Sequence, residues 1–175
     1  VKYGTKIFEK RQQFTDSIVP LIQQYYDIIS NGNEKVTVIY QSHLQENDFG
    51  TLLQENSEKD RILTYTSTGI HKDDLVFEMN GNSLKKIGSQ GQQKSFLIAL
   101  KLSQMNRIKE LTGKTPVLLL DDIFDKLDDT RVSQLIELVN QEHFGQIFIT
   151  DTNRERTEKV VKKINEESRI FEIEP

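Results

Sequence analysis

The sequence feature that most constrains the fold is an apolar run that ends in two carboxylates, Pro-Val-Leu-Leu-Leu-Asp-Asp at residues 116–122. An uninterrupted apolar stretch of this kind is typical of a strand that is buried on both faces of a parallel sheet. Helical patterns flank it at residues 92–111 and 128–141, and a second buried strand is expected at residues 145–151. Strands and helices that alternate at this spacing predict an α/β fold with a parallel sheet. A charged surface helix at residues 152–168 and a last strand at residues 169–174 continue the pattern.

The first ninety residues have a different organisation. Apolar side chains at three- and four-residue spacing predict a helix over residues 3–30, which Pro20 kinks or divides into two pieces. A strand is expected at residues 35–43 and a mostly polar helix at residues 47–61. Two alternating runs around Asn80-Gly81 predict a β-hairpin.

Composition excludes several classes of protein. The 175 residues suffice for one domain with a core, and no apolar run approaches the roughly 20 residues that a membrane span needs. The absence of cysteine excludes disulfides and thiolate metal sites, and the charged first residues lack the pattern of a signal peptide. We therefore expect a cytoplasmic protein with no membrane partner. The net charge of −4 does not by itself favour DNA binding. Because Val1 opens within a helical pattern, we expect a fragment of a longer protein.

The two carboxylates at the end of the apolar run are candidates for metal and water chemistry. Ligands of open α/β sheets bind at the carboxyl ends of the strands, where Asp121 and Asp122 emerge. One carboxylate there can hold a Mg²⁺ ion that bridges phosphate oxygens, and a second can orient or deprotonate an attacking water. The alternative is that these residues only cap the next helix.

A second candidate is Gly-Ser-Gln-Gly-Gln-Gln-Lys-Ser at residues 88–95. Ser89 followed by Gln92 is a capping-box arrangement at the start of a helix, and glycines at 88 and 91 allow the backbone to approach a ligand closely. A helix N-terminus with free N–H groups and a hydroxyl can bind an anion. The alternative is a plain capped helix after a hairpin.

In this order and spacing, the motifs resemble the signature, Walker B and D-loop of ABC-type ATPases. The Ser-Gly-Gly-Gln-like signature corresponds to Ser89, Gln90, Gly91 and Gln92, with a departure at the second place. The resemblance implies that Asp121 holds the metal and that Asp122, in place of the usual glutamate, is the catalytic base. Asp128 matches the D-loop. The switch position, often a histidine, is occupied by Thr150 and Asp151.

A narrower resemblance is to the bacterial RecF family of recombinational-repair ATPases. It rests on residues 88–95, on Leu-Ile-Ala-Leu-Lys-Leu-Ser-Gln at 97–104, and on residues 115–131 and 146–152. Upstream, Gly-Ile-His-Lys-Asp-Asp-Leu at 69–75 resembles that family's Gly-Pro-His-Arg-Asp-Asp-Leu. A metal site from this stretch is a minor alternative, since adjacent residues seldom converge on one ion; the resemblance favours a structural or signature-supporting role for His71.

This resemblance implies the carboxyl-terminal half of an ABC-type ATPase head. Residues 1–33 would be a helical segment from an arm-like second domain, and residues 34–175 the lobe with signature, Walker B and D-loop. It implies ATP and Mg²⁺ as cofactors, a homodimer that forms around ATP with the signature acting in trans, and binding to gapped or junction DNA. It also implies partners of the RecR and RecO type, recombinase loading and the SOS response.

The phosphate loop that such an ATPase needs is not recognisable in this sequence. Gly113-Lys114-Thr115 has the right ending, but Ile108 stands where the first glycine belongs and the segment runs from helix to strand. Gly113 is better explained as a helix stop. We therefore expect the 175-residue chain alone to neither bind ATP tightly nor hydrolyse it. Two alternatives stay open: another SMC-like or overcoming-lysogenization-defect (OLD-type) ATPase head, and a non-enzymatic α/β interaction module.

Overall fold

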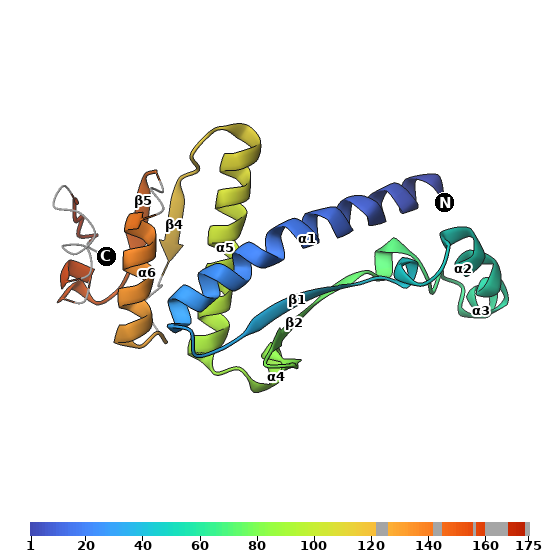
Figure 1. Ribbon diagram of the computed structural model, residues 1–175, viewed down its shortest axis with the longest axis horizontal. Coiled ribbons are helices and arrows are strands. Elements are labelled where there is room, and N and C mark those ends of the chain that lie inside the picture. The colour runs from blue at the N-terminus through green and yellow to red at the C-terminus, as the bar shows by residue number, and fades with distance from the viewer. Residues whose placement is uncertain (122–125, 142–144, 156, 160–167, 174–175) are drawn as a thin grey trace.

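The structure is a computed structural model that describes residues 1–121, 126–141, 145–155, 157–159 and 168–173. The molecule is elongated, and helix α1 (Lys2–Ser30) runs along it (Figure 1). One end holds helices α5 (Gln90–Thr112) and α6 (Asp129–Gln141) with strands β4 (Leu118–Asp121) and β5 (Ile147–Thr150). The other end holds helices α2 (Phe49–Glu55) and α3 (Ser57–Leu63) together with the start of α1.

Helix α1 is continuous, so the predicted helix is confirmed but its division at Pro20 is wrong. The helix ends at Asn31, which takes the left-handed conformation with φ 57°. Its carboxyl-terminal half packs against α5 and α6, whereas Tyr3 and Phe14 in the first half are exposed. The core forms where these three helices meet, and its most buried side chains are Ile22, Tyr25, Tyr26, Ile29, Ala99, Leu102, Leu135 and Leu138.

An antiparallel sheet extends beside α1 between the two ends of the molecule (Figure 1). Strand β1 (Val36–Gln41) pairs with β2 (Asp74–Met79), and β2 turns through Asn80 and Gly81 into β3 (Asn82–Ser83). Both turn residues have positive φ, as a tight hairpin requires, so the predicted hairpin is confirmed. Its second arm is only two residues long because the chain then enters the short helix α4 (Leu84–Ile87), whose Leu84 is buried.

The segment between β1 and β2 differs from the single helix predicted over residues 47–61. It contains two 3-10 turns, η1 (His43–Gln45) and η2 (Ile70–Lys72), and two short α-helices, α2 and α3. The break falls at Asn56, whose backbone N–H and side-chain amide both donate to the carbonyl of Leu52. Phe49 of α2 lies against Gly4 of α1, where an added Cβ would come within 2.2 Å of its ring.

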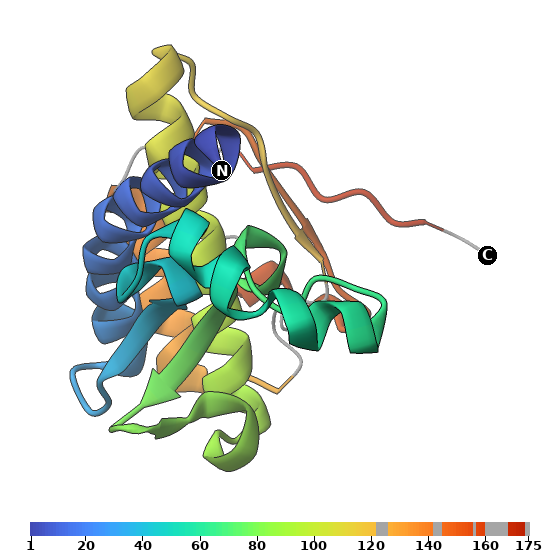
Figure 2. The ribbon, with the colours of Figure 1, turned by 90° about the vertical axis from the view of Figure 1, so that its right-hand side faces the viewer.

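Strands β4 and β5 are parallel, as the sequence predicts, with Leu118 opposite Ile147 and Asp121 opposite Thr150. Figure 2 shows α5 and α6 on the same side of this sheet, with α1 beyond them. The expectation of burial on both faces is wrong: Leu119 is 72% exposed and its register partner Phe148 is 48% exposed. Helices cover one face only, because in the described part of the chain nothing packs over Leu119.

The strand predicted at residues 169–174 is also wrong over its described part. Residues 168–173 form no ladder with any described strand, and Ile170, Phe171 and Ile173 are exposed. Without a partner strand, the backbone N–H and C=O groups of this segment cannot pair. The alternation of apolar and polar residues therefore does not by itself produce a strand here. Residues 154, 155 and 157–159 are helical, and the rest of the charged helix predicted there lies mostly outside the described residues. Among the described helices, none is long and apolar enough to cross a membrane.

Candidate functional site

The turn that opens α5 is a capping box, as the sequence predicts. The hydroxyl Oγ of Ser89 accepts from the backbone N–H of Gln92 at 3.2 Å, and the Oε1 of Gln92 accepts from the backbone N–H of Ser89 at 2.7 Å. The backbone N–H groups of Gln90 and Gly91 also lie in this first turn, where the geometry of a helix provides no acceptor within the helix. The turn therefore presents N–H groups at the positive end of a helix of 23 residues, an arrangement that suits an anion. The other end of α5 is the predicted glycine stop, with Gly113 at φ 66°.

The same turn touches the segment that the sequence matched to a D-loop. A Cβ added at Gly91 would lie 2.9 Å from the carbonyl oxygen of Lys126, so only glycine permits this approach. Lys126 itself has a positive φ of 69°, which directs its carbonyl in a way that few non-glycine residues adopt. Two residues on, Asp128 caps α6 through its Oδ1, which accepts from the backbone N–H of Arg131 at 2.9 Å. Residues 88–92, the signature turn, and residues 126–128, the D-loop turn, are thus in contact.

The predicted metal ligand, Asp121, lies at the carboxyl end of β4 and is exposed. The hydroxyl of Thr150, its register partner on β5, donates to its Oδ1. This bond orients the carboxylate, whose second oxygen has no hydrogen bond from the described residues, and carboxylate oxygens are the ligands that Mg²⁺ takes in proteins. Because β4 runs opposite to α5, Asp121 and the signature turn lie toward the same end of the layer (Figures 1 and 2).

Two further site predictions have different outcomes. Asp122, the predicted catalytic base, lies outside the described residues. Asp151, in the predicted switch position, follows β5 directly, and its Oδ1 accepts from the backbone N–H of Asn153 at 2.8 Å. Its Oδ2 is buried, with no hydrogen-bond partner in the part of the chain that the structure describes. The reading in which the carboxylates at 121 and 122 cap the next helix loses support, because Asp128 caps α6 and Asp121 binds Thr150.

A half-buried polar cluster that the sequence did not predict lies beside the two turns. Glu34, in the link between α1 and β1, accepts from Gln92 at 2.9 Å, from Arg131 at 2.8 Å and from the hydroxyl of Tyr26 at 2.5 Å. Arg131 also donates from Nη1 to the buried Ser95 at 3.1 Å, and its Nε lies 3.3 Å from Asp128. The i,i+3 spacing of Asp128 and Arg131 could have indicated their ion pair from the sequence. Glu34 lies in a stretch with turn residues, and nothing there indicated a contact with Arg131.

The charges in this cluster are mutually stabilised. Burial by itself raises the pKa of Glu34, but hydrogen bonds from Gln92 and Tyr26 and the charge of Arg131 outweigh it, so the pKa lies below its ordinary value. Burial lowers the pKa of Arg131, but the attraction of Glu34 raises it above its ordinary value. Burial and the bond to Glu34 together raise the pKa of Tyr26. Glu34 and Arg131 therefore form an ion pair at neutral pH, with Tyr26 as a neutral donor.

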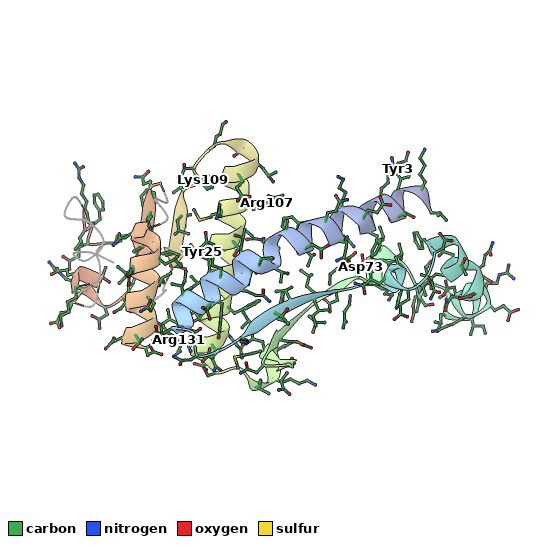
Figure 3. All side chains as sticks on the ribbon, in the orientation of Figure 1. Tyr3, Tyr25, Asp73, Arg107, Lys109 and Arg131 are labelled. Atoms are coloured by element: carbon green, nitrogen blue, oxygen red, sulfur yellow. The ribbon has the colours of Figure 1, made fainter. Side chains whose placement is uncertain are left out.

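The stretch at residues 69–75 has a structural role beside α1, toward the end of the molecule that holds α2 and α3 (Figure 1). Asp73 accepts from Arg11 of α1 at 2.7 Å and from the hydroxyl of Tyr40 at 2.5 Å, and Arg11 also donates to the carbonyl of Ile70. A ring nitrogen of His71 lies 2.8 Å from the carbonyl oxygen of Thr66. Figure 3 shows Asp73 far from Arg131, and the bond of His71 is to Thr66, so the structure favours the structural reading of His71 over signature support. The described residues contain no cluster of His, Asp and Glu that could hold a metal ion.

Comparison with known proteins agrees with the resemblance. No protein-family model matches the chain. A DNA replication and repair protein RecF from Flavobacterium johnsoniae is 54% identical over 172 residues, which is 98% of this chain and 48% of that protein. RecF from Phocaeicola vulgatus is 45% identical over 172 residues, again 98% of this chain and 46% of that protein. The chain thus spans about half the length of the curated relatives that it matches.

Two kinds of solved structure are similar to this chain. The recombination mediator protein RecF in the RecFOR pathway, solved as RecF-ATP, is 28% identical with a TM-score of 0.67, and the match covers 87% of this chain and 43% of that chain. An SMC head bound to the C-winged helix domain of ScpA is 14% identical with a TM-score of 0.53, covering 82% of this chain and 36% of that chain. The latter similarity shows the fold alone, an α/β fold of the kind found in ATPase heads.

Proposed function

The chain belongs to the RecF family of DNA replication and repair proteins, and from this premise we propose that it forms the signature half of an ATP-dependent DNA-binding head. In the proposal two copies of the whole protein close around ATP and Mg²⁺, and the signature turn of one copy contacts the γ-phosphate that the other holds. The dimer binds gapped or junction DNA and works in the cytoplasm with partners of the RecR and RecO type. Its role is to support recombinase loading and the SOS response.

The observation that carries the proposal is the arrangement of two turns and one carboxylate at the same end of the layer. The signature turn offers backbone N–H groups, and the D-loop turn contacts it at Gly91. Asp121 lies at the carboxyl end of β4, and its Oδ1 accepts a hydrogen bond from Thr150. We assign the phosphate contact to Ser89, Gln90 and Gly91. The side chain of Gln92 is used within its own chain, for the cap and for Glu34, so its role is to fix the turn.

For the remaining site residues we propose the roles that the sequence predicts, and for Thr150, predicted in the switch region, the added role of orienting Asp121. Asp121 is proposed to hold Mg²⁺, which would bridge phosphate oxygens and neutralise their charge. Asp122 is proposed to orient or deprotonate the attacking water. Thr150 orients Asp121, Asp151 occupies the switch position, and Asp128 places the D-loop turn by capping α6.

The exposed face of the parallel sheet supports the view that this lobe is completed by further protein. Leu119 and Phe148 are neighbours on that face, and Val117 beside them is also exposed. An exposed apolar sheet face marks a contact surface, and the curated relatives are about twice as long as this chain. We propose that the lobe with the phosphate loop covers this face, and that the 175-residue chain alone is inactive as an ATPase.

Two other functions are less well supported. An SMC-like head has the same fold, but its identity to this chain is 14%, against 54% for a RecF relative. A non-enzymatic interaction module would leave the charge and geometry of Asp121 without a purpose, since this residue caps no described helix.

The proposal is tested on the full-length protein by measuring its ATP hydrolysis and its ATP-driven dimerisation with and without duplex DNA. Asp121→Asn is expected to abolish Mg²⁺-dependent hydrolysis. Thr150→Val, which removes only the bond that orients this carboxylate, is expected to lower hydrolysis by a smaller factor. Unchanged hydrolysis in Asp121→Asn would remove the metal role of this residue.

A further inference from the structure

The guanidinium of Arg131 connects three segments that are distant in sequence. Nη1 donates to Ser95, one turn beyond Gln92 on α5, and Nη2 donates to Glu34. Nε faces Asp128 of the D-loop turn at 3.3 Å. Only a planar fork with several fixed donors can reach three partners in this way; a lysine ammonium acts as a single point charge on a flexible stem.

Glu34 also connects the signature turn with α6. One oxygen, Oε1, accepts from Gln92 of the signature turn and from Arg131 of α6. The side chains of Glu34 and Arg131 are 15% and 13% exposed, so the pair is largely withdrawn from water. A largely enclosed pair of this kind adds little net stability compared with apolar side chains, and fixing one arrangement of the neighbouring segments is a role that such pairs can take.

We propose that Arg131, together with Glu34, is a positioning residue that holds the signature turn and the D-loop turn in one fixed relation. The inference rests on the function proposed above, because the two turns are expected to meet the nucleotide of a second subunit together. Gly91 and the carbonyl of Lys126 form the direct contact between the two turns. The Glu34–Arg131 pair connects the helices α5 and α6 that follow these turns. A shift of the signature turn on binding phosphate is therefore transmitted to the start of α6.

The test uses Arg131→Lys in the full-length protein, which keeps the charge and removes the fork. We expect the Kd of the monomer for ATP to stay within about twofold and ATP-driven dimerisation to weaken by about tenfold or more, in line with the loss of charge-assisted hydrogen bonds. The matched control is Arg107→Lys on the same helix layer. Arg107 pairs with Glu110 near the other end of α5 (Figure 3), so this variant should dimerise like the wild type.

A second pair of variants separates positioning from stability. Glu34→Gln keeps the shape of the side chain and removes its charge, whereas Val132→Ala shortens a buried apolar side chain of α6 and removes no side-chain hydrogen bond of the cluster. At a temperature where both are folded, we expect Glu34→Gln to dimerise weakly and Val132→Ala to dimerise normally. Wild-type dimerisation in both Arg131→Lys and Glu34→Gln would overturn the inference, as would unfolding of both, which would show that the pair holds the fold. If the wild type itself does not dimerise with ATP, the proposed function fails instead.

Discussion

The contact between the signature turn and the D-loop turn makes a quantitative prediction for Gly91→Ala. The new Cβ would lie 2.9 Å from the carbonyl oxygen of Lys126, whereas close carbon–oxygen contacts lie at roughly 3.3–3.6 Å. One backbone must therefore move by about 0.4–0.7 Å. Alanine in place of glycine stabilises a helix by at most about 1 kcal/mol, and overpacking costs about 1–3 kcal/mol. The net loss should be about 0–2 kcal/mol.

Thermal unfolding and ATP-driven dimerisation of the full-length protein separate the effect of Gly91→Ala on stability from its effect on the D-loop turn. The small net loss corresponds to a fall in Tm of no more than about 8 °C for a unit of this size, whereas ATP-driven dimerisation should fall clearly because the D-loop turn is displaced. Gly113→Ala is the matched control. It strains a left-handed position at a cost of roughly 1–2 kcal/mol, but no atom of the described residues lies within 4 Å of its Cβ, so dimerisation should be unchanged. A Gly91→Ala protein that is more stable than the wild type and dimerises normally would refute the reasoning.

Three further predictions concern the carboxylates and the chain itself. Asp122→Asn in the full-length protein should slow ATP hydrolysis more than ATP binding, and unchanged turnover would remove this residue as the base. The 175-residue chain alone should show no ATP turnover, so measurable turnover would contradict the placement of the phosphate loop elsewhere. Because the folded pKa of Glu34 lies below its ordinary 4.5, its contribution to stability is present above pH 4.5 and is lost as the pH falls through the folded pKa. Thermal unfolding below pH 5 should be less pH-dependent in Glu34→Gln, and equal slopes would argue against an ionised Glu34 in the fold.

Local signals in the sequence predicted the elements that depend on local chemistry. The Ser89–Gln92 cap, the Gly113 stop and the Asn80-Gly81 turn each follow from a few neighbouring residues, and each is found in the structure. The parallel sheet followed from the spacing of its strands. The break at Asn56 was missed because apolar periodicity does not show the bond from the Asn56 side chain to the carbonyl of Leu52.

Features that depend on distant residues could not be predicted in the same way. The cluster at Glu34 joins Tyr26, Gln92 and Arg131, and the pair with Arg131 spans 97 positions in sequence. An apolar run at Leu119 indicates burial, but whether its second face is covered depends on residues that the described chain does not bring there. The sequence therefore predicted the carboxylate of Asp121 and the two turns of the candidate site. Only the fold shows that the signature turn and the D-loop turn are in contact.

In the proposed function, the signature turn acts on a nucleotide held by a second subunit. Ser89→Arg places a bulky cation at that turn, and sedimentation velocity of the full-length protein, combined with a titration of ATP against the monomer, measures both sides of the claim. The account predicts that this variant binds ATP nearly as the wild type does and stays monomeric when ATP is added. Equal loss of monomer binding and dimerisation, or normal dimerisation, would contradict it.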